Sequence, residues 1–537
     1  MKIRASLLTT VTTVVGMYLF WIVVRKFLGY PITAYVLRDA LSGLCITLLL
    51  LTFFGRKGAW LYLAAWVVPA MLYGFVGLTY GMPDKNALIA LFNTDFHETS
   101  EYLKLIPPTV YMAYGAAIIF MVALFFLMRR TDWSFLRKRR VWVGIFVLLF
   151  SVSGASFLKS YTRYGEILIT DWRVSEVVLY KDLVGAFDSI TEEDKKRSLF
   201  DRSTNWKLQS ISEESKGCEV CILVMGESAR RDFMQAYGAP WKDTPWMSEA
   251  LGLKFENFIS ASSATAPSLS VELYAPDVKG MAPWGDNVVS LANLAGYHTE
   301  WISNQNKGGA VDSPVSQAAS FADKIVFKTE SANVTKLSDD AMLPDIATAL
   351  SNKGKVFVVV HLMGSHPMAC NRTKGEYDDY FLSKELSCYI KSLKNTDEFL
   401  RKVAKLAQDS ADGRSWSLMY TSDHALDFAK TSEGWAMKHM ADRQNSFKVP
   451  LFITGSGYQE KVEIDALRSG RYFSLFVAQW MGLKAEGKEP APECDWLSNE
   501  ACPDQNKVRA WYGPFFPIES LPDYPLSRFI EEHGNEK

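Results

Sequence analysis

Five long apolar runs in the first 160 residues set the strongest limit on how this chain can fold. They lie at about 7–24, 32–54, 59–80, 106–128 and 141–158. A helix that crosses the hydrocarbon core of a bilayer needs about 20 mainly apolar residues. We therefore predict an N-terminal bundle of five transmembrane helices over residues 1–158. The second span is the weakest, because Arg38 and Asp39 lie near its start.

Basic residues in the short loops predict the orientation of this bundle, because Lys and Arg are enriched in cytoplasmic loops. A cytoplasmic N-terminus puts the basic cluster 129–140 inside, although Arg25 and Lys26 then oppose the rule on the outer side. Five spans place the rest of the chain outside the cytoplasm. The first run lacks a small-residue cleavage site after its apolar core, which favours an uncleaved anchor.

Cysteine usage agrees with an exported second half. Six of the seven cysteines fall there, and an even number suits an oxidising compartment. We expect Cys370 to pair with Cys388 and Cys494 with Cys502, because each pair closes a polar loop.

Cys218 and Cys221 leave two alternatives open. They open a predicted strand, in which the side chains of residues three apart point to opposite faces, so a direct bridge needs a bend. A pair of packed thiols is the other alternative. A four-cysteine zinc knuckle needs a second close pair, which the sequence lacks.

The remainder of the chain divides into two parts. Residues 159–216 mix aromatic and apolar residues with charges, which suits segments on the bilayer surface, although a plain linker has the same pattern. From residue 217 to about 480, strands alternate with helical stretches, which indicates one α/β domain with a mainly parallel sheet over 217–537. The tail after Gly482 is Pro-rich and loop-like, and there are no internal repeats.

Three strongly apolar runs of this domain end in residues that can bind metals. CILVM precedes Gly226-Glu227, VFVVV precedes His361, and SLMY precedes Thr421-Ser422 and the Asp423-His424 pair. Such runs are typical of buried parallel strands. Because sites in open α/β sheets form at the carboxyl ends of strands, we expect these residues to converge.

Asp423 and His424 can both reach one metal ion if the strand end bends, and the alternative is a surface Asp beside a hydrogen-bonded His. Glu227 favours the metal, since zinc accepts Glu, Asp and His ligands together. A serine-hydrolase elbow at Ser228 is disfavoured, because Arg230 stands where that motif needs Gly. We expect Ser228 to cap the helix that follows.

A nucleophile could come from the hydroxyl-rich stretch 260–270, which follows a predicted strand at 254–259. No spacing rule selects one of its hydroxyls, but a hydroxyl bound to zinc is deprotonated near neutral pH. His366 and His439, each alone more often structural, could hold a phosphoryl oxygen or protonate a leaving alkoxide. Asn304 and Lys307, after a predicted strand at 298–302, are weaker candidates for binding an anion.

These motifs in this order resemble the bacterial phosphoethanolamine transferases, inner-membrane members of the alkaline phosphatase and sulfatase-like superfamily. The resemblance covers five spans, Gly226–Arg231, the Thr265 segment, the segment from His361 to His366, Ser422-Asp423-His424 and His439, and so essentially the whole chain. Segments 86–93, 98–105, 226–232 and 361–372 are most similar to the transferase that decorates osmoregulated periplasmic glucans.

The resemblance implies an alkaline-phosphatase-like domain with one or two zinc ions, bound by Glu227, Thr265, Asp423 and His424. Thr265, which precedes Ala266 and Ser268, would be the residue that becomes modified. His366 and His439 would contact the phosphoryl group or a second zinc. Lys307, followed by Gly308, matches a substrate-binding lysine, although its spacing from Asn304 differs. The lipid A enzymes carry cysteines around the nucleophile, and this chain has none there.

The implied reaction moves phosphoethanolamine from phosphatidylethanolamine in the inner membrane to a periplasmic glycan or a lipid-linked glycan. It proceeds through a modified threonine and releases diacylglycerol, and no nucleic acid takes part. Alternatives are a lipid A or lipopolysaccharide-core transferase and a glycerol phosphate transferase like lipoteichoic acid synthase, against which the segment from His361 to His366 argues. A sulfatase is disfavoured because Thr265–Leu269 lacks the convertible Cys or Ser and the Arg of that motif. A membrane scaffold with a degenerate site is the non-enzymatic alternative.

Overall fold

The computed structural model describes the chain except for residues 1, 81–98, 100–102, 104–105, 165–202, 211–216, 277–283, 307–313, 330–337, 432–433, 487–491, 512 and 537. Side chains at 2–6, 35, 79–80, 153–164 and 210 also lie outside the description. The chain divides into two compact units. Unit 1 is Met1–Phe92 with Ile106–Ser198, and unit 2 is Asn93–Leu105 with Leu199–Lys537. Each is described by itself.

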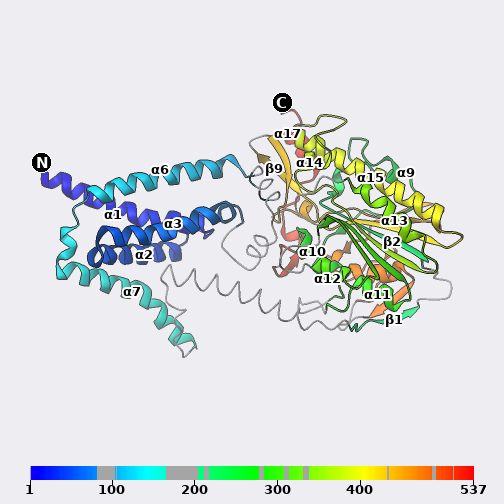
Figure 1. The fold of residues 1–537 in the computed structure, drawn as a ribbon, viewed down its shortest axis with the longest axis horizontal. Coiled ribbons are helices and arrows are strands. Elements are labelled where there is room, and N and C mark those ends of the chain that lie inside the picture. Colours follow the sequence, from blue (N-terminus) through cyan, green and yellow to red (C-terminus); the bar gives the residue numbers. More distant parts are fainter. Residues whose placement is uncertain are drawn as a thin grey trace. The chain divides into compact units, whose positions relative to one another are not determined.

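Unit 1 is a bundle of long apolar helices (Figure 1). They are α1 (Lys2–Phe27), α2 (Ala34–Phe53), α3 (Gly55–Tyr80), α6 (Pro108–Arg130) and α7 (Arg139–Tyr164). Among the described residues, four segments are long and apolar enough to cross a membrane: Leu7–Phe27, Val36–Phe53, Gly55–Leu78 and Pro108–Arg130. They correspond to the first four predicted spans. The fifth, in α7, stays a prediction, because the side chains after residue 152 are not described.

A buried ion pair joins two of the charges that lie in or next to the first two predicted spans. Arg25, near the end of α1, donates from Nη2 to Oδ2 of Asp39 in α2 at 3.0 Å, and both side chains are almost fully buried. The guanidinium also lies 4.2 Å from the ring centre of Tyr30. Because each charge inside an apolar bundle needs a partner, the two residues are placed together rather than exposed to lipid.

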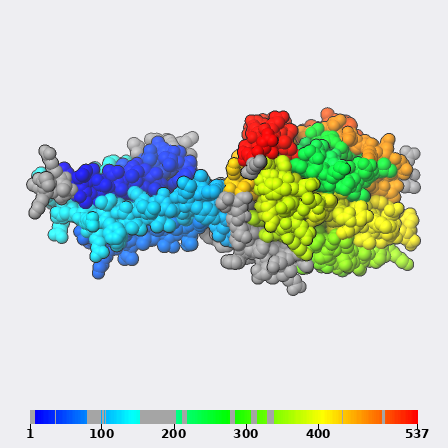
Figure 2. Space-filling model, turned by 90° about the horizontal axis from the view of Figure 1, so that it is seen from above, coloured from blue at the N-terminus to red at the C-terminus, as the bar shows by residue number. Residues whose placement is uncertain are grey.

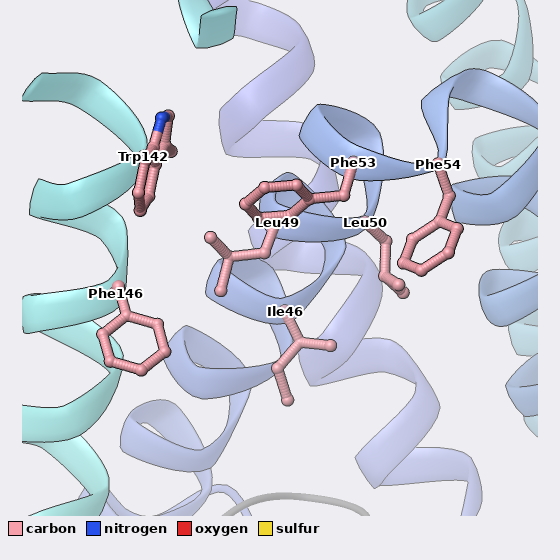
Figure 3. Close-up of a pocket in the computed structure, with 7 residues that line it drawn as sticks. All are labelled: Ile46, Leu49, Leu50, Phe53, Phe54, Trp142 and Phe146. Atoms are coloured by element: carbon pink, nitrogen blue, oxygen red, sulfur yellow. The ribbon is translucent and has the colours of Figure 1, made fainter. Parts of the chain in front are cut away.

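A purely apolar cavity of about 330 Å³ lies between α2 and α7 (Figure 3). Trp142 and Phe146 of α7 face Ile46, Leu49 and Phe53 of α2 across it, and Leu50 and Phe54 complete its lining. Phe53 and Trp142 make an edge-on contact with ring centres 5.8 Å apart. A lining without polar atoms is compatible with the lipid side of a membrane bundle.

Unit 2 is built on an eight-stranded sheet in the order β12-β3-β11-β8-β2-β7-β5-β6. The strands are β2 (Val220–Gly226), β3 (Gly252–Phe255), β5 (His298–Asn306), β6 (Lys324–Thr329), β7 (Val356–His361), β8 (Trp416–Ser422), β11 (Leu451–Gly455) and β12 (Lys461–Ile464). Strands β8, β2, β7, β5 and β6 are parallel, while β11 runs antiparallel to both β8 and β3. The mainly parallel sheet agrees with the prediction from sequence.

Helices cover both faces of this sheet (Figure 1), so its central strands are buried on both sides. In β2, Cys221, Leu223 and Met225 join one core with α10 (Thr265–Glu272), α11 (Val288–Leu294), α12 (Pro314–Ala319) and α16 (Phe473–Trp480). The alternate residues Val220, Ile222 and Val224 join a second core with α13 (Leu343–Leu350) and α15 (Lys384–Ser410). Burial on two faces explains the continuous apolar runs of the sequence.

The predicted surface segment or linker at 159–216 and the tail predicted to be loop-like both contain regular elements of unit 2. β1 (Lys207–Ser210), in the predicted surface segment 159–216, pairs with β14 (Leu483–Glu486). The tail after Gly482 also forms β15 (Lys507–Arg509), β16 (Phe515–Pro517) and α17 (Leu526–His533), so the loop-like prediction was wrong there. Figure 2 shows the C-terminal residues on the surface of unit 2, where α17 buries Leu526 and Phe529. The expected membrane-surface residues 165–202 lie outside the described residues.

All six cysteines of unit 2 form disulfides. The pairs Cys370–Cys388 and Cys494–Cys502 are those predicted. Cys218 and Cys221 are also bridged, so the alternative of packed thiols was wrong. The bridge is possible because Cys218 precedes β2, which begins at Val220, and is not held in the alternation of the strand.

Candidate active site

The carboxyl ends of β2 and β8 lie side by side, because Gly226 and Ser422 are register partners in the parallel pair. Glu227 and Asp423 are the next residues of these two strands, and both are almost completely buried. His361 ends β7 on the other side of β2, where it is the register partner of Met225. The three strand ends therefore meet at one edge of the sheet, as parallel strands require.

Asp423 and His424 turn toward the same point because β8 ends at Ser422. The Nε2 atom of His424 lies 3.2 Å from Oε1 of Glu227 and 3.5 Å from Oδ2 of Asp423. Its Nδ1 atom is bonded to the carbonyl oxygen of Ala425 at 3.0 Å, which fixes the orientation of the ring. The bend that the sequence prediction required is present.

Thr265 is the hydroxyl of the 260–270 stretch that reaches this cluster. As the first residue of α10, it donates from Oγ1 to Oε2 of Glu227 at 3.0 Å and lies 3.2 Å from His424 Nε2. The hydroxyls of Ser260, Ser262, Ser268 and Ser270 are bonded elsewhere, for example that of Ser262 to the Arg509 carbonyl. The structure thus selects the residue that spacing alone could not.

His439 belongs to the same cluster. One ligand atom from each of Glu227, His424 and His439 lies within 4.8 Å of the other two, which is a spacing that one metal ion can span. The rings of His424 and His439 are 4.8 Å apart, and that of His366 is 6.1 Å from His439. The resemblance assigned His439 to the phosphoryl group or to a second zinc, and here it lies directly beside two predicted metal ligands.

The donor atoms present fit zinc. They are carboxylate oxygens, imidazole nitrogens and a hydroxyl, which zinc binds in proteins. Oδ2 of Asp423 is buried and has no hydrogen-bond partner among the described residues. Two carboxylates buried side by side repel each other, and a divalent cation is a usual partner for such a pair.

Burial and neighbouring charges both shift the pKa values of this cluster, and for Glu227 and His424 they act in opposite directions. Burial would raise the pKa of Glu227, but the hydrogen bond and charge of His424 hold it well below its usual value. Burial and the negative charge of Glu227 raise the pKa of Asp423. Burial lowers the pKa of His424, but Asp423 and Glu227 outweigh it and raise that pKa to about 9. For His439, burial and the neighbouring histidines lower the pKa well below its usual value, which favours a neutral ring.

The chain is similar in sequence to known proteins. A sequence model of the Sulfatase family matches residues 219–483. Phosphoethanolamine transferase OpgE of Escherichia coli K12 is 32% identical over 76% of this chain and 77% of its own length. A putative phosphoethanolamine transferase of Haemophilus influenzae is 33% identical over 66% of this chain and 71% of its own length.

The chain belongs to the phosphoethanolamine transferase family. Among solved structures, lipooligosaccharide phosphoethanolamine transferase A of Neisseria meningitidis is 15% identical to this transferase-family protein. The match covers 88% of this chain and 95% of that chain, with a TM-score of 0.49.

Of the two predicted anion-binding residues of this transferase-family protein, the structure describes Asn304 alone. Lys307 lies outside the described residues. Asn304 donates from Nδ2 to Oδ1 of Asp339 at 2.8 Å. The carboxylate of Asp339 also accepts from the backbone N–H groups of Met363 and Gly364, at 2.9 and 3.0 Å. In this arrangement Asn304 helps to hold the loop after β7.

Gln305 is a residue that the sequence argument missed. Its Nε2 atom donates to Oε2 of Glu227 at 3.1 Å and to the carbonyl oxygen of Leu362 at 2.8 Å. The predicted strand ended at residue 302, whereas β5 continues to Asn306 and carries Gln305 to the strand ends. A longer strand prediction would have placed this residue beside the cluster.

Ser228 and His361 have roles other than those expected of the strand ends. Ser228 does not cap a helix, because a short 3₁₀ turn at Arg231–Phe233 follows and Arg230 is its N-cap. Instead its hydroxyl donates to Oε1 of Glu227 at 2.5 Å. His361 is buried with Nδ1 near Ser303 Oγ at 3.3 Å, and burial lowers its pKa to about 4.

Proposed function

We propose that this protein transfers phosphoethanolamine from phosphatidylethanolamine to a periplasmic glycan, such as an osmoregulated periplasmic glucan. The observation that carries the proposal is the position of the Thr265 hydroxyl, bonded to Glu227 and adjacent to His424 at the strand ends. A hydroxyl that contacts both a buried carboxylate and a buried imidazole of the metal-type ligands is the arrangement that nucleophilic catalysis needs. Membership of the phosphoethanolamine transferase family supports the choice of transferred group.

In the first half-reaction, Oγ1 of Thr265 gives up its proton and forms a bond to phosphorus, while the bond to the diacylglycerol oxygen breaks and that oxygen takes up a proton. In the second, an acceptor hydroxyl takes the phosphoethanolamine and the Thr265 hydroxyl is restored. Glu227, Thr265, Asp423 and His424 would hold zinc, with His439 close enough to join them. Zinc bound there would lower the pKa of the attacking hydroxyl and offset phosphoryl charge.

The histidines and the helix start would serve the phosphoryl group. His439, held neutral by its surroundings, and His366 beside it could contact phosphoryl oxygens or transfer the proton of the leaving group. Thr265 is the first residue of α10, so a group that it carries would lie near the N-terminal end of this helix, where a negative charge is favourable. If a second zinc ion takes part, His366 would be one of its ligands.

The membrane half would bring the site to its donor. We infer five spans over 1–158, a bridging segment at 159–216 and a periplasmic catalytic domain at 217–537, in a bacterial inner membrane. Four apolar helices among the described residues support the anchor, and three disulfides support an oxidising compartment. The head group of phosphatidylethanolamine lies at the membrane surface, within reach of a tethered domain.

Diacylglycerol release from defined lipids tests the donor. Full-length protein in vesicles is expected to release diacylglycerol from phosphatidylethanolamine and not from phosphatidylglycerol. Thr265→Ala should abolish release. Ser270→Ala is the control, because it removes another hydroxyl of α10, one that donates to the Pro267 carbonyl, and it should leave release intact. Release from phosphatidylglycerol alone would instead support a glycerol phosphate transferase.

Mass spectrometry of cell-envelope glycans tests the acceptor. We compare periplasmic glucans and lipid A from cells with and without the gene. Loss of phosphoethanolamine from the glucans is expected, whereas an unchanged glucan profile with altered lipid A would refute the preferred acceptor.

A further inference from the structure

Glu272 is a buried carboxyl that the proposed reaction leaves without a role. It is the last residue of α10, the helix that Thr265 begins, and it is fully buried. Oε1 accepts hydrogen bonds from the backbone N–H of Ala261 at 2.9 Å and from the hydroxyl of Ser268 at 3.0 Å. Oε2 is buried and has no hydrogen-bond partner among the described residues. Burial of a carboxyl with one unpaired oxygen lowers the free energy of unfolding, so we expect this group to perform a function.

These bonds fix the loop that leads into Thr265. Ser268 Oγ accepts from the N–H of Ser262 at 3.2 Å while it donates to Glu272. The amide of Ala261 is thereby bonded to Glu272 directly, and the amide of Ser262 is bonded to it through the Ser268 hydroxyl. Two consecutive amides of the loop are thus attached to α10. On its other side, the loop is held by Ser262 Oγ, which donates to the Arg509 carbonyl at 3.0 Å. The loop cannot shift without breaking bonds on both sides.

The backbone at Gly470 closes the space around the carboxyl. A Cβ at this position would collide with Oε1 of Glu272 and stand 2.7 Å from the N atom of Ala261. The absence of a side chain there lets the chain at Gly470–Tyr472 pack directly over the carboxyl. Burial raises the pKa of Glu272 to about 7, but a carbonyl-type oxygen can accept both bonds in either protonation state.

We propose that Glu272 is a positioning residue for Thr265. By holding the amides of Ala261 and Ser262, it fixes the start of α10 and so keeps the Thr265 hydroxyl at Glu227 and His424. This inference rests on the proposed function, in which Thr265 is the nucleophile. A displacement of about 1 Å at a reacting atom can reduce a rate about 100-fold.

Three variants of the full-length protein in detergent or vesicles test the proposal. Glu272→Ala removes the acceptor, whereas Glu272→Gln keeps one carbonyl oxygen in its place. Asp397→Ala is the matched control, because Asp397 is also buried and accepts two backbone N–H groups, those of Trp246 and Met247, at 2.9 Å each. Its bonds hold α9 (Pro245–Glu249) and not the loop before Thr265.

Diacylglycerol release from phosphatidylethanolamine is the first readout, normalised to the folded fraction. Glu272→Ala is expected to lower kcat about 10- to 100-fold with KM within about twofold of wild type. Glu272→Gln should restore kcat to within about threefold, since it keeps the acceptor oxygen. Asp397→Ala should leave kcat within about twofold, because it acts on stability only. An equal loss in Glu272→Ala and Asp397→Ala, or no rescue by Gln, would overturn the proposal.

Amide hydrogen exchange is the second readout, and it does not depend on activity. Amides of residues 261–265 should exchange faster in Glu272→Ala than in wild type, and at the wild-type rate in Asp397→Ala and Glu272→Gln. Unchanged exchange of this loop in Glu272→Ala would refute the role of Glu272. If wild type releases no diacylglycerol, the proposed function fails, and the exchange data still decide whether Glu272 holds the loop.

Discussion

At the scale of single residues, the carboxylate of Glu227 is the most heavily bonded group of the site. Oε1 accepts from Ser228 and contacts His424, while Oε2 accepts from Thr265 and Gln305. Charge-assisted bonds of this kind explain how a carboxylate stays ionised although it is almost completely buried. The same bonds fix which oxygens face the nucleophile.

Removal of Gln305 should therefore weaken metal binding. Gln305→Ala deletes a donor that orients a ligand, and loss of such a partner lowers metal affinity about 10- to 100-fold. Competition for zinc with a chromophoric chelator measures this affinity. Gln444→Ala serves as control, because Gln444 donates to the Leu521 carbonyl away from the site. Equal zinc affinity in the two variants would show that Gln305 has no orienting role.

The buried carboxyl of Glu272 also predicts how stability depends on pH. Burial raises its folded-state pKa to about 7, above the value of an unfolded glutamate. The folded state therefore binds more protons than the unfolded state between about pH 4 and 7, so this group lowers stability as pH rises through that window. Glu272→Gln should show a smaller fall in Tm from about pH 5 to about pH 8 than wild type, at saturating zinc.

Scanning fluorimetry across that pH range measures the difference. A Tm profile for Glu272→Gln that runs parallel to that of wild type would contradict the shifted pKa.

At the scale of elements, the sequence predicted the strands that leave a continuous apolar run along the chain. It missed the features that depend on contacts between separate segments. The apolar runs of β2, β7 and β8 gave their positions, because burial on two faces leaves a continuous signal. The end of β5 was missed, because its last residues are polar. Gln305 could not be assigned, since the atoms that it bonds belong to residues 57 and 78 positions away in sequence. Glu272 could not be assigned, since no sequence pattern marks a buried carboxyl that bonds the loop before its own helix.

The turn after β7 illustrates such a contact between elements. Gly364 has a φ of +47°, and a Cβ there would lie 2.9 Å from the carbonyl oxygen of Glu227. The backbone of this turn also bonds Glu227, since the N–H of Ser365 donates to the same carbonyl at 3.0 Å. Close approach of two backbones at the site requires glycine here.

Gly364→Ala should therefore disturb Glu227 and reduce zinc affinity by at least about 10-fold, as loss of a ligand-orienting contact does. Gly375→Ala is the matched control. Its φ of +79° imposes similar backbone strain, but its Cβ would meet only the flexible end of Lys384, at 3.3 Å. Both variants should lower Tm, and only Gly364→Ala should lower zinc affinity. Equal zinc affinity in Gly364→Ala and Gly375→Ala would contradict this prediction, because the contact with Glu227 would then have no effect on metal binding.

At the scale of the whole molecule, composition predicted an apolar bundle followed by an α/β domain. Four spans follow from length and hydropathy alone. The position of Arg25, which opposes the charge rule, and that of Asp39, which weakens the second span, are explained only by their pairing. The boundary between the parts was less predictable, because β1 is short and pairs with a strand more than 270 residues later in the chain.

The central claim is that Thr265 carries phosphoethanolamine between donor and acceptor, and mass spectrometry of the protein tests it most directly. Full-length protein is incubated with phosphatidylethanolamine without acceptor and digested with trypsin, which releases Thr265 in the peptide between Lys254 and Lys279. Fragmentation should place a phosphoethanolamine group on Thr265 in wild type, and none on this peptide in Thr265→Ala. The group on another residue, or an unmodified peptide while diacylglycerol is released, would contradict the account.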